Sequence, residues 1–188
     1  GDKQITVEAC VHHLHFSEAD YERCGNFIKC NPAIKRTEDR DALRAAIAED
    51  RIDVIATDHA PHTLEEKLAT SYFDAPAGLP LVQHALQMGL ELVHDHVLTL
   101  PHLVSKVCHA PAERFDVKER GYLREGYWAD LALVDLTVPQ RVEREAVLYK
   151  CGWSPLEGEV LRSKVCATIV NGEVKYKDGV FHGAPNGQ

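Results

Sequence analysis

The chain has 188 residues, of which 45% are hydrophobic and 27% are charged. This balance is typical of a globular protein with a buried core, and it excludes disordered, collagenous and coiled-coil classes. Acidic residues outnumber basic ones by 29 to 21, and the net charge of −8 argues against a nucleic-acid partner. No apolar run approaches the roughly 20 residues of a membrane helix, so we expect a cytoplasmic protein with no membrane contact. Six cysteines without a C-x-x-C pair are expected to be reduced thiols.

Two strand-like stretches flank two helical patterns in the first third of the chain. Residues 4–11 and 52–57 are rich in Val, Ile and Thr and are expected to form strands. Residues 17–24 begin with a Ser-x-x-Asp capping signal, and residues 37–50 carry apolar positions at helical spacing behind a capping Thr37. Strands separated by helices predict an α/β fold with a parallel sheet.

The middle of the chain combines a long irregular stretch with further helical patterns. Residues 57–80 contain three prolines and no periodicity, so we expect a long and functional loop there. Residues 81–95 and 100–108 repeat apolar side chains at helical spacing, with Val82 facing inward, and are expected to be helices. A final turn is expected at 112–115.

After residue 117 the pattern changes to short strands separated by Gly, Pro and Asn. Strands are expected at 130–136, 164–170 and 173–177. The last two flank Asn171-Gly172, which is a strong two-residue hairpin signal. We therefore expect two regions, residues 1–117 and a small β domain at residues 118–188.

The string ATDHAPH at residues 56–62 is the densest group of chemically active side chains. Asp58 directly follows an expected strand, and α/β folds place catalytic groups at the carboxyl ends of their strands. A carboxylate there can bind a divalent metal ion and can accept a proton from water whose pKa that ion lowers. In the alternative interpretation, Asp58 only forms a turn with the backbone amides that follow it.

Three other positions have a functional and a structural interpretation. His12 and His13 also follow an expected strand, and they either line the same site or only form local hydrogen bonds. Asn31 carries an amide that donates and accepts, which suits a substrate with carbonyl and imide groups, but Asn before Pro is also common in turns. Gly78 in the loop at 75–80 either allows backbone to approach a ligand or simply precedes a helix.

Six strings form an ordered set of motifs along the chain. They are EACVHHL at 8–14, KCNPAIKRTEDRDAL at 29–43, ATDHAPHTLEEK at 56–67, APAGLP at 75–80, GYLREGYWADLALVDL at 121–136 and KCGWSPLEG at 150–158. Together they resemble the dihydroorotase family of the amidohydrolase superfamily. The string at 121–136 resembles the segment by which chains of that superfamily return from their barrel to a small β domain.

The resemblance implies an α/β fold, namely the C-terminal part of a metal-dependent (β/α)8 TIM barrel plus a small β-sandwich domain. It implies reversible cyclisation of N-carbamoyl-L-aspartate to L-dihydroorotate in pyrimidine biosynthesis, with zinc, as one or two divalent ions, as the cofactor. Asp58 then corresponds to a metal ligand and the general acid/base. The substrate contacts correspond to Asn31, His62, Ala77 and Gly78, and no role follows for the other histidines.

Members of the family carry their other metal ligands upstream of the motifs present here. These are a His-x-His pair, a carboxylated lysine or an aspartate, and two further histidines, together with an arginine that holds the substrate carboxylate. We therefore expect a C-terminal portion that is inactive alone, with the substrate, a missing N-terminal barrel segment and a homo-oligomer as partners. Two alternatives stay open: a cyclic amidohydrolase of the hydantoinase or allantoinase type, and a non-catalytic dihydroorotase-like scaffold subunit.

Overall fold

Two short parallel strands lie at the centre of the N-terminal half. The structure, a computed structural model, describes residues 5–185. Strand β1 (Glu8–Cys10) pairs in parallel with β2 (Val54–Ala56), which confirms the expected α/β arrangement. Both strands are shorter than predicted, because a helix begins directly after β1 and irregular residues flank β2. Residue 4 of the first predicted strand lies outside the described residues.

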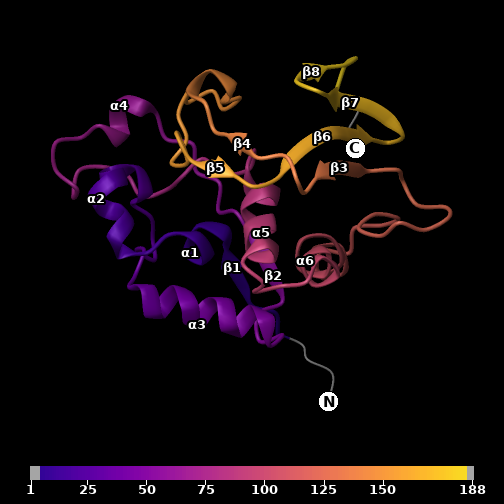
Figure 1. Ribbon diagram of the computed structural model, residues 1–188, viewed down its shortest axis with the longest axis horizontal. Helices are drawn as coiled ribbons and strands as arrows, with labels where there is room; N and C mark the ends of the chain where they lie inside the picture. The colour runs from indigo at the N-terminus through magenta and orange to yellow at the C-terminus, as the bar shows by residue number, and fades with distance from the viewer. Residues whose placement is uncertain (1–4, 186–188) are drawn as a thin grey trace.

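Helical segments fill the connection between the two strands (Figure 1). They are α1 (Val11–His15), η1 (Glu18–Asp20), α2 (Tyr21–Cys24), η2 (Gly25–Ile28) and α3 (Thr37–Ala48). The first predicted capping signal is confirmed, because the Ser17 N–H donates to the Asp20 carboxylate at 2.8 Å. The predicted cap at Thr37 is wrong. Arg36 is the extended residue before α3, and its N–H donates to the Asp39 carboxylate at 3.2 Å.

The long loop predicted at 57–80 contains a short helix, α4 (Leu64–Lys67). The Thr63 hydroxyl accepts a hydrogen bond from the Glu66 N–H at 3.3 Å, and the Thr63 N–H donates to the Glu66 carboxylate at 2.7 Å. This reciprocal pair is a capping box, which starts a helix even where no apolar periodicity follows. The expectation of a loop without regular structure is therefore wrong at this point.

Further helical segments follow the loop, and two details differ from the prediction. They are α5 (Ala85–His94), α6 (Leu100–Val104), the π-helical η3 (Ser105–His109) and α7 (Ala110–Arg114). Val82 precedes α5 and is 59% exposed, so it does not face inward. The predicted turn at 112–115 is helical as far as Arg114. Pro111 has no N–H to donate to the helix before it. The wider π turn of η3 precedes this proline, and the chain remains helical through it into α7.

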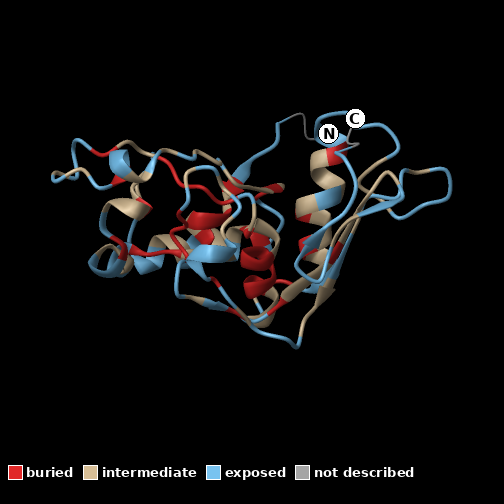
Figure 2. Ribbon diagram, turned by 90° about the horizontal axis from the view of Figure 1, so that it is seen from above, coloured by how far each residue is buried: buried red, intermediate tan, exposed pale blue. Residues whose placement is uncertain are grey.

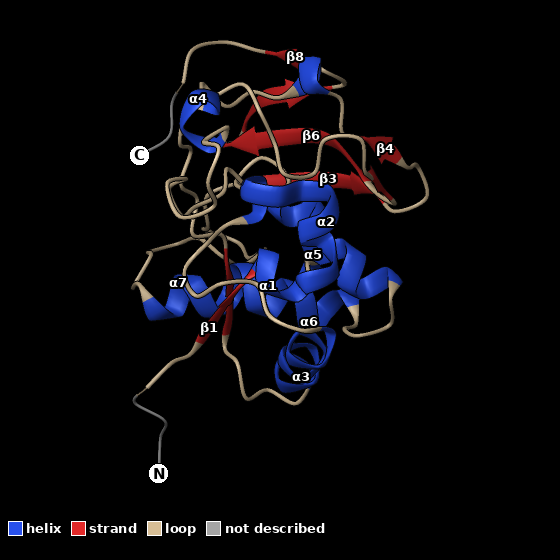
Figure 3. Ribbon diagram, turned by 90° about the vertical axis from the view of Figure 1, so that its left-hand side faces the viewer, coloured by secondary structure: helices blue, strands red, loops and turns tan. Residues whose placement is uncertain are grey.

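The C-terminal part of the chain is mainly antiparallel sheet. Its elements are β3 (Leu131–Asp135), β4 (Gln140–Arg141), η4 (Arg144–Ala146), β5 (Val160–Leu161), β6 (Lys164–Val170), β7 (Glu173–Lys177) and β8 (Val180–Phe181). The sheet order is β3-β6-β7-β8, of which β3, β6 and β8 are labelled in Figure 3. Strand β4 pairs with β5. Asn171 and Gly172 have φ angles of 52° and 80° between β6 and β7, which confirms the hairpin. The pair β4-β5 is a separate two-stranded sheet, and the β-sandwich stays a prediction.

The hydrophobic core continues across the predicted boundary at residue 118. Val11, Ile28 and Leu79 pack with Leu156 and Leu161 in one buried cluster, so the C-terminal part of the chain completes the N-terminal core. A second cluster joins side chains of β1, α3, α5 and α6. Figure 2 shows the buried segments gathered at the centre of the molecule. The division into two domains therefore stays a prediction.

Two parallel strands are a small part of a barrel wall, and no closed barrel is formed by residues 5–185. The (β/α)8 barrel also stays a prediction. Among these same residues, no helix is long and apolar enough to cross a membrane. All six cysteines are free thiols, as expected from their spacing.

Candidate active site

Asp58 lies at the carboxyl end of β2, two residues beyond Ala56. Its φ of 47° is in the left-handed region, which Asp tolerates better than most residues, and the residue is exposed. Within the described part of the chain, its carboxylate has no hydrogen-bond or ion-pair partner, and it forms no turn bond to the amides that follow. An unpaired carboxylate at a strand end can take up a cation or a proton.

The half-buried thiol of Cys10 and the buried thiol of Cys30 both feel the charge of Asp58. Burial raises the pKa of Cys10 to about 11, and the charges of Asp58 and Glu8 add to this effect. Burial also raises the pKa of Cys30 to about 11, with a smaller contribution from Asp58. Cys10 pairs with Ala56 in the parallel register, so its thiol and Asp58 lie at the same edge of the two strands.

Backbone hydrogen bonds join the loops that carry the sequence motifs. The Gly78 N–H donates to the Lys29 carbonyl at 2.9 Å. The Ala60 N–H donates to the Leu79 carbonyl at 2.9 Å, beside a parallel bridge between His59 and Leu79. The loops around Lys29, Ala60 and Gly78 therefore form one cluster, although they come from separate parts of the sequence.

Lys67 of α4 holds this cluster together from inside. Its side chain is buried, with 1% of the residue exposed, and the ammonium donates to the carbonyls of Lys29, Pro76 and Gly78 at 3.3, 3.0 and 3.0 Å. Burial lowers the pKa of Lys67 to about 8. The Trp153 ring lies 5.7 Å from the Lys67 Nζ atom. Three backbone carbonyls satisfy the three N–H donors of the ammonium, so Lys67 fastens two motif loops to α4.

The His62 ring contacts the backbone that was predicted to bind substrate. Its Nε2 atom donates to the Ala77 carbonyl at 3.1 Å, and the Trp153 Nε1 donates to the His62 carbonyl at 2.8 Å. Gly78 has a φ of 141°, and a Cβ atom there would lie 2.5 Å from the Ala60 Cβ and 3.1 Å from the His62 ring. Only glycine allows this close approach. His62, Ala77 and Gly78 are thus brought together.

Two further histidines have structural partners. His59 Nδ1 accepts hydrogen bonds from the N–H groups of Leu81 and Val82 at 3.0 and 3.3 Å, so it holds the turn before α5. His13 Nε2 donates to the Pro32 carbonyl at 2.8 Å and ties α1 to the Asn31 loop. This contact is long-range, so the purely local alternative considered for His13 does not hold.

Sequence reasoning missed two residues that position the cluster, Lys67 and Trp153, whereas it had singled out His13 as a candidate. Lys67 and Trp153 lie in strings that carry the family resemblance, but those strings give no sign that the lysine is buried. Asn31 is exposed on its loop and makes no side-chain hydrogen bond within residues 5–185. Asp58 and Asn31 are therefore near the cluster without being bonded to it.

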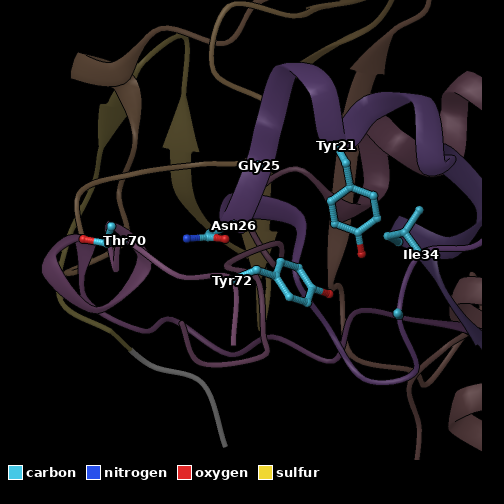
Figure 4. A pocket seen from close by; sticks show the side chains of 7 residues that line it. Tyr21, Gly25, Asn26, Ile34, Thr70 and Tyr72 are labelled. Atoms are coloured by element: carbon cyan, nitrogen blue, oxygen red, sulfur yellow. The ribbon is translucent and has the colours of Figure 1, made fainter. Parts of the chain in front are cut away.

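A surface pocket of about 570 Å³ lies beside the Asn31 loop. Figure 4 shows Tyr21, Asn26, Thr70 and Tyr72 around it, and the two tyrosine rings meet edge to face with centroids 6.0 Å apart. None of the five predicted site residues lines this pocket. It is therefore separate from the candidate active site.

Comparison with known proteins places the chain in a family. The model of the amidohydrolase family matches residues 3–175. A dihydroorotase of Clostridium acetobutylicum is 39% identical over 175 residues, which cover 93% of this chain and 41% of that protein. A dihydroorotase of Pyrococcus furiosus is 33% identical, with 99% of this chain and 43% of that protein covered. The chain thus spans about two-fifths of the length of these relatives.

Solved structures show the same fold. The L-hydantoinase (dihydropyrimidinase) of Arthrobacter aurescens superposes with a TM-score of 0.88 at 27% identity, covering 94% of this chain and 40% of that one. A D-hydantoinase superposes with a TM-score of 0.84 at 22% identity, with the same coverage of both chains. The match of the family model to most of the chain agrees with the ordered motifs and with the cluster that they form. The chain belongs to the amidohydrolase family.

Proposed function

We propose that this chain forms part of a dihydroorotase, which interconverts N-carbamoyl-L-aspartate and L-dihydroorotate by closing and opening a cyclic amide. The observation that carries the proposal is the cluster of motif loops. In it His62 bonds to Ala77, and the bridge between His59 and Leu79 joins this loop to the residue that follows the unpaired Asp58. The relatives that bear the dihydroorotase name support it.

Asp58 is the general acid/base of the proposed reaction. Opening the ring requires that water loses a proton and that the departing ring nitrogen gains one. A carboxylate without a protein partner can perform both transfers at one oxygen. In the direction of ring closure, the same oxygen takes the proton from the carbamoyl nitrogen and delivers it to the oxygen that leaves the carboxyl group.

Asp58 also fits a ligand position for a divalent metal ion, because its carboxylate has no competing partner among residues 5–185. When bound, such an ion supplies an activated nucleophile and polarises the carbonyl that is attacked. We propose zinc, as one or two ions. The other ligands are proposed to come from polypeptide outside residues 1–188.

The proposed substrate contacts are Asn31, His62, Ala77 and Gly78. Both backbone polar groups of Gly78 are already bonded, to Lys29 and Lys67. The Ala77 N–H has no partner within the described residues, so it is the group free to donate to a substrate carbonyl. Gly78 keeps the approach to that N–H open, and the exposed Asn31 amide can pair with an imide edge.

Replacement of Asp58 tests the proposal. Asp58→Asn in the complete enzyme keeps the size of the side chain and a residue that tolerates positive φ, so the fold should persist. Turnover of L-dihydroorotate should fall at least about 100-fold, the lower end of what general acid-base catalysis contributes. Asp74→Asn, a matched change at another exposed aspartate, should leave turnover intact. Equal activity of the two variants would refute the assignment.

Structural similarity to hydantoinases supports a second candidate, a hydantoinase-type hydrolase of a different cyclic amide. The substrate preference of the complete enzyme separates the two candidates. If the protein is instead a dihydroorotase-like scaffold, neither L-dihydroorotate nor hydantoin should be turned over.

The remaining proposals concern organisation. Residues 1–117 are proposed to be barrel units and residues 118–188 a small β domain. Parallel sheets are usually covered on both faces and extended by further strands, so β1 and β2 are proposed to join strands supplied by an N-terminal barrel segment. Self-association into a homo-oligomer and a cytoplasmic location are also proposed, and the free thiols support the location.

A further inference from the structure

Three metal-binding side chains converge where β1 runs into α1. Cys10, His12 and His13 each offer one ligand atom, and these atoms all lie within 4.8 Å of one another. The centroids of the two imidazole rings are 4.2 Å apart. None of these side chains has a catalytic or substrate-binding role in the function proposed above.

His12 is the least explained of the three. The residue is 0% exposed, and within the described part of the chain neither ring nitrogen has a hydrogen-bond partner. The Thr57 backbone is close but outside hydrogen-bonding geometry. Burial lowers the pKa of His12 to about 3, so the ring is neutral at physiological pH. A buried polar group without a partner is costly and rare, and a neutral imidazole is the form that binds metal ions.

His13 is held in the tautomer that a metal ligand needs. Its Nε2 donates to the Pro32 carbonyl at 2.8 Å, which leaves the lone pair on Nδ1 free. Metal-binding histidines usually donate their other ring N–H to a carbonyl or a carboxylate in this way. The Cys30 thiol donates to the same carbonyl at 3.1 Å, so the Pro32 carbonyl that accepts from His13 is held in place by a second hydrogen bond.

The local charge favours a cation. Glu8 lies two residues before Cys10 on β1, and Asp58 follows β2, which pairs with β1. A divalent ion at this place would be attracted by those carboxylates, and it would stabilise the thiolate form of Cys10.

We propose that Cys10, His12 and His13 form a zinc site distinct from the ion proposed at Asp58. One thiolate and two imidazoles are a typical zinc donor set, with a water molecule in the fourth position. Ligand atoms around a tetrahedral zinc ion are about 3.5 Å apart, given bonds of roughly 2.0–2.3 Å. Side-chain movements of about 1 Å therefore bring the three ligand atoms to the spacing that a zinc ion requires. The Cys10 proton leaves to solvent as the sulfur–zinc bond forms, and no redox step is involved.

Cobalt(II) is the probe, since it takes the place of zinc and reports its ligands in absorption spectra. One equivalent of Co²⁺ added to the metal-free, purified chain should produce a thiolate-to-cobalt charge-transfer band and the intense d–d bands of tetrahedral geometry. Cys10→Ser should remove the charge-transfer band and weaken affinity at least about tenfold, which is 1.4 kcal/mol. Cys166→Ser, at a similarly half-buried thiol, should change neither the charge-transfer band nor the affinity for Co²⁺.

Asp58→Asn separates this site from the proposed catalytic ion. The cobalt spectrum should survive Asp58→Asn, whereas a spectrum lost in that variant would mean that the metal is held by Asp58 and would overturn the proposal. A band that persists in Cys10→Ser, or that never forms in the wild-type chain, would overturn it as well. One measurement needs no variant. Zn²⁺ should slow alkylation of Cys10 at least about tenfold, and equal rates with and without zinc would contradict the site.

Discussion

The buried ammonium of Lys67 is expected to hold the candidate active site in its folded arrangement. Lys67→Met keeps the length and apolar stem of the side chain and removes three hydrogen bonds. The Lys29 carbonyl would still accept from the Gly78 N–H, so two carbonyls, those of Pro76 and Gly78, would lose their only partner among the described residues.

The magnitude follows from two opposing effects. Each buried carbonyl left without a partner costs about 1–3 kcal/mol, so two cost about 2–6 kcal/mol. The burial penalty of the ammonium is relieved. The fall of the Lys67 pKa from 10.5 to about 8 corresponds to a penalty of about 3 kcal/mol. The balance therefore lies between a gain of about 1 kcal/mol and a loss of about 3 kcal/mol in the free energy of unfolding, so the local opening of the motif loops is the sharper readout.

Urea unfolding measures the effect of Lys67→Met on the stability of the whole chain, and amide hydrogen exchange measures its effect on the motif loops. Exchange at the Gly78 and Ala60 amides, which bond between motif loops, should accelerate in Lys67→Met. Lys29→Met is the matched control, because the Lys29 ammonium bonds to the exposed carbonyl of Tyr72 and should leave those two amides unaffected. If Lys67→Met unfolds at the wild-type urea concentration with unchanged exchange at Gly78, then the ammonium does not hold the loops.

Two other changes test the geometry and the electrostatics of the fold. Gly78→Ala places a Cβ 2.5 Å from the Ala60 Cβ and should lose more stability in urea than Gly152→Ala, which shares a positive φ but has no atom within 4 Å. Equal losses would show that the close approach at Gly78 is not tight. Burial lowers the pKa of His84 from 6.5 to about 4. Between these two pH values the His84 ring binds a proton in the unfolded chain but not in the folded chain. Stability should therefore fall as pH drops from 6.5 to 4, by up to about 3 kcal/mol from this group. His84→Gln should flatten the acid limb of the unfolding curve, whereas the exposed His182→Gln should not, and identical limbs in both variants would contradict the reasoning.

Local signals predicted most elements of the fold. The β-branched run that ends in Ala56, the Ser17 capping signal and the Asn171-Gly172 hairpin act over a few residues, and the structure contains each of them. The same kind of signal was available at Thr63 and Glu66, but the search for apolar periodicity overlooked α4. Helix starts were less predictable. The apolar spacing at residues 81–84 predicts helix, but α5 begins only at Ala85.

The candidate site was predictable only in part. The rule that catalytic groups follow parallel strands led to the prediction of Asp58, and the family resemblance led to the prediction of His62 and Ala77. The bond between the last two depends on contacts distant in sequence, above all the burial of Lys67. In sequence, Lys67 follows two glutamates on a short helix, which is typical of an exposed face, so nothing local shows that backbone carbonyls surround it.

The most direct test of the proposed function is the substrate preference of the complete enzyme. Hydrolysis of L-dihydroorotate and of hydantoin should be measured side by side, with and without a metal chelator. The proposal predicts a kcat/KM for L-dihydroorotate at least about 100-fold higher, as expected where a site pairs with polar groups that the other substrate lacks, and loss of that activity with the chelator. Preference for hydantoin, or no turnover of either compound by the metal-loaded enzyme, would contradict it.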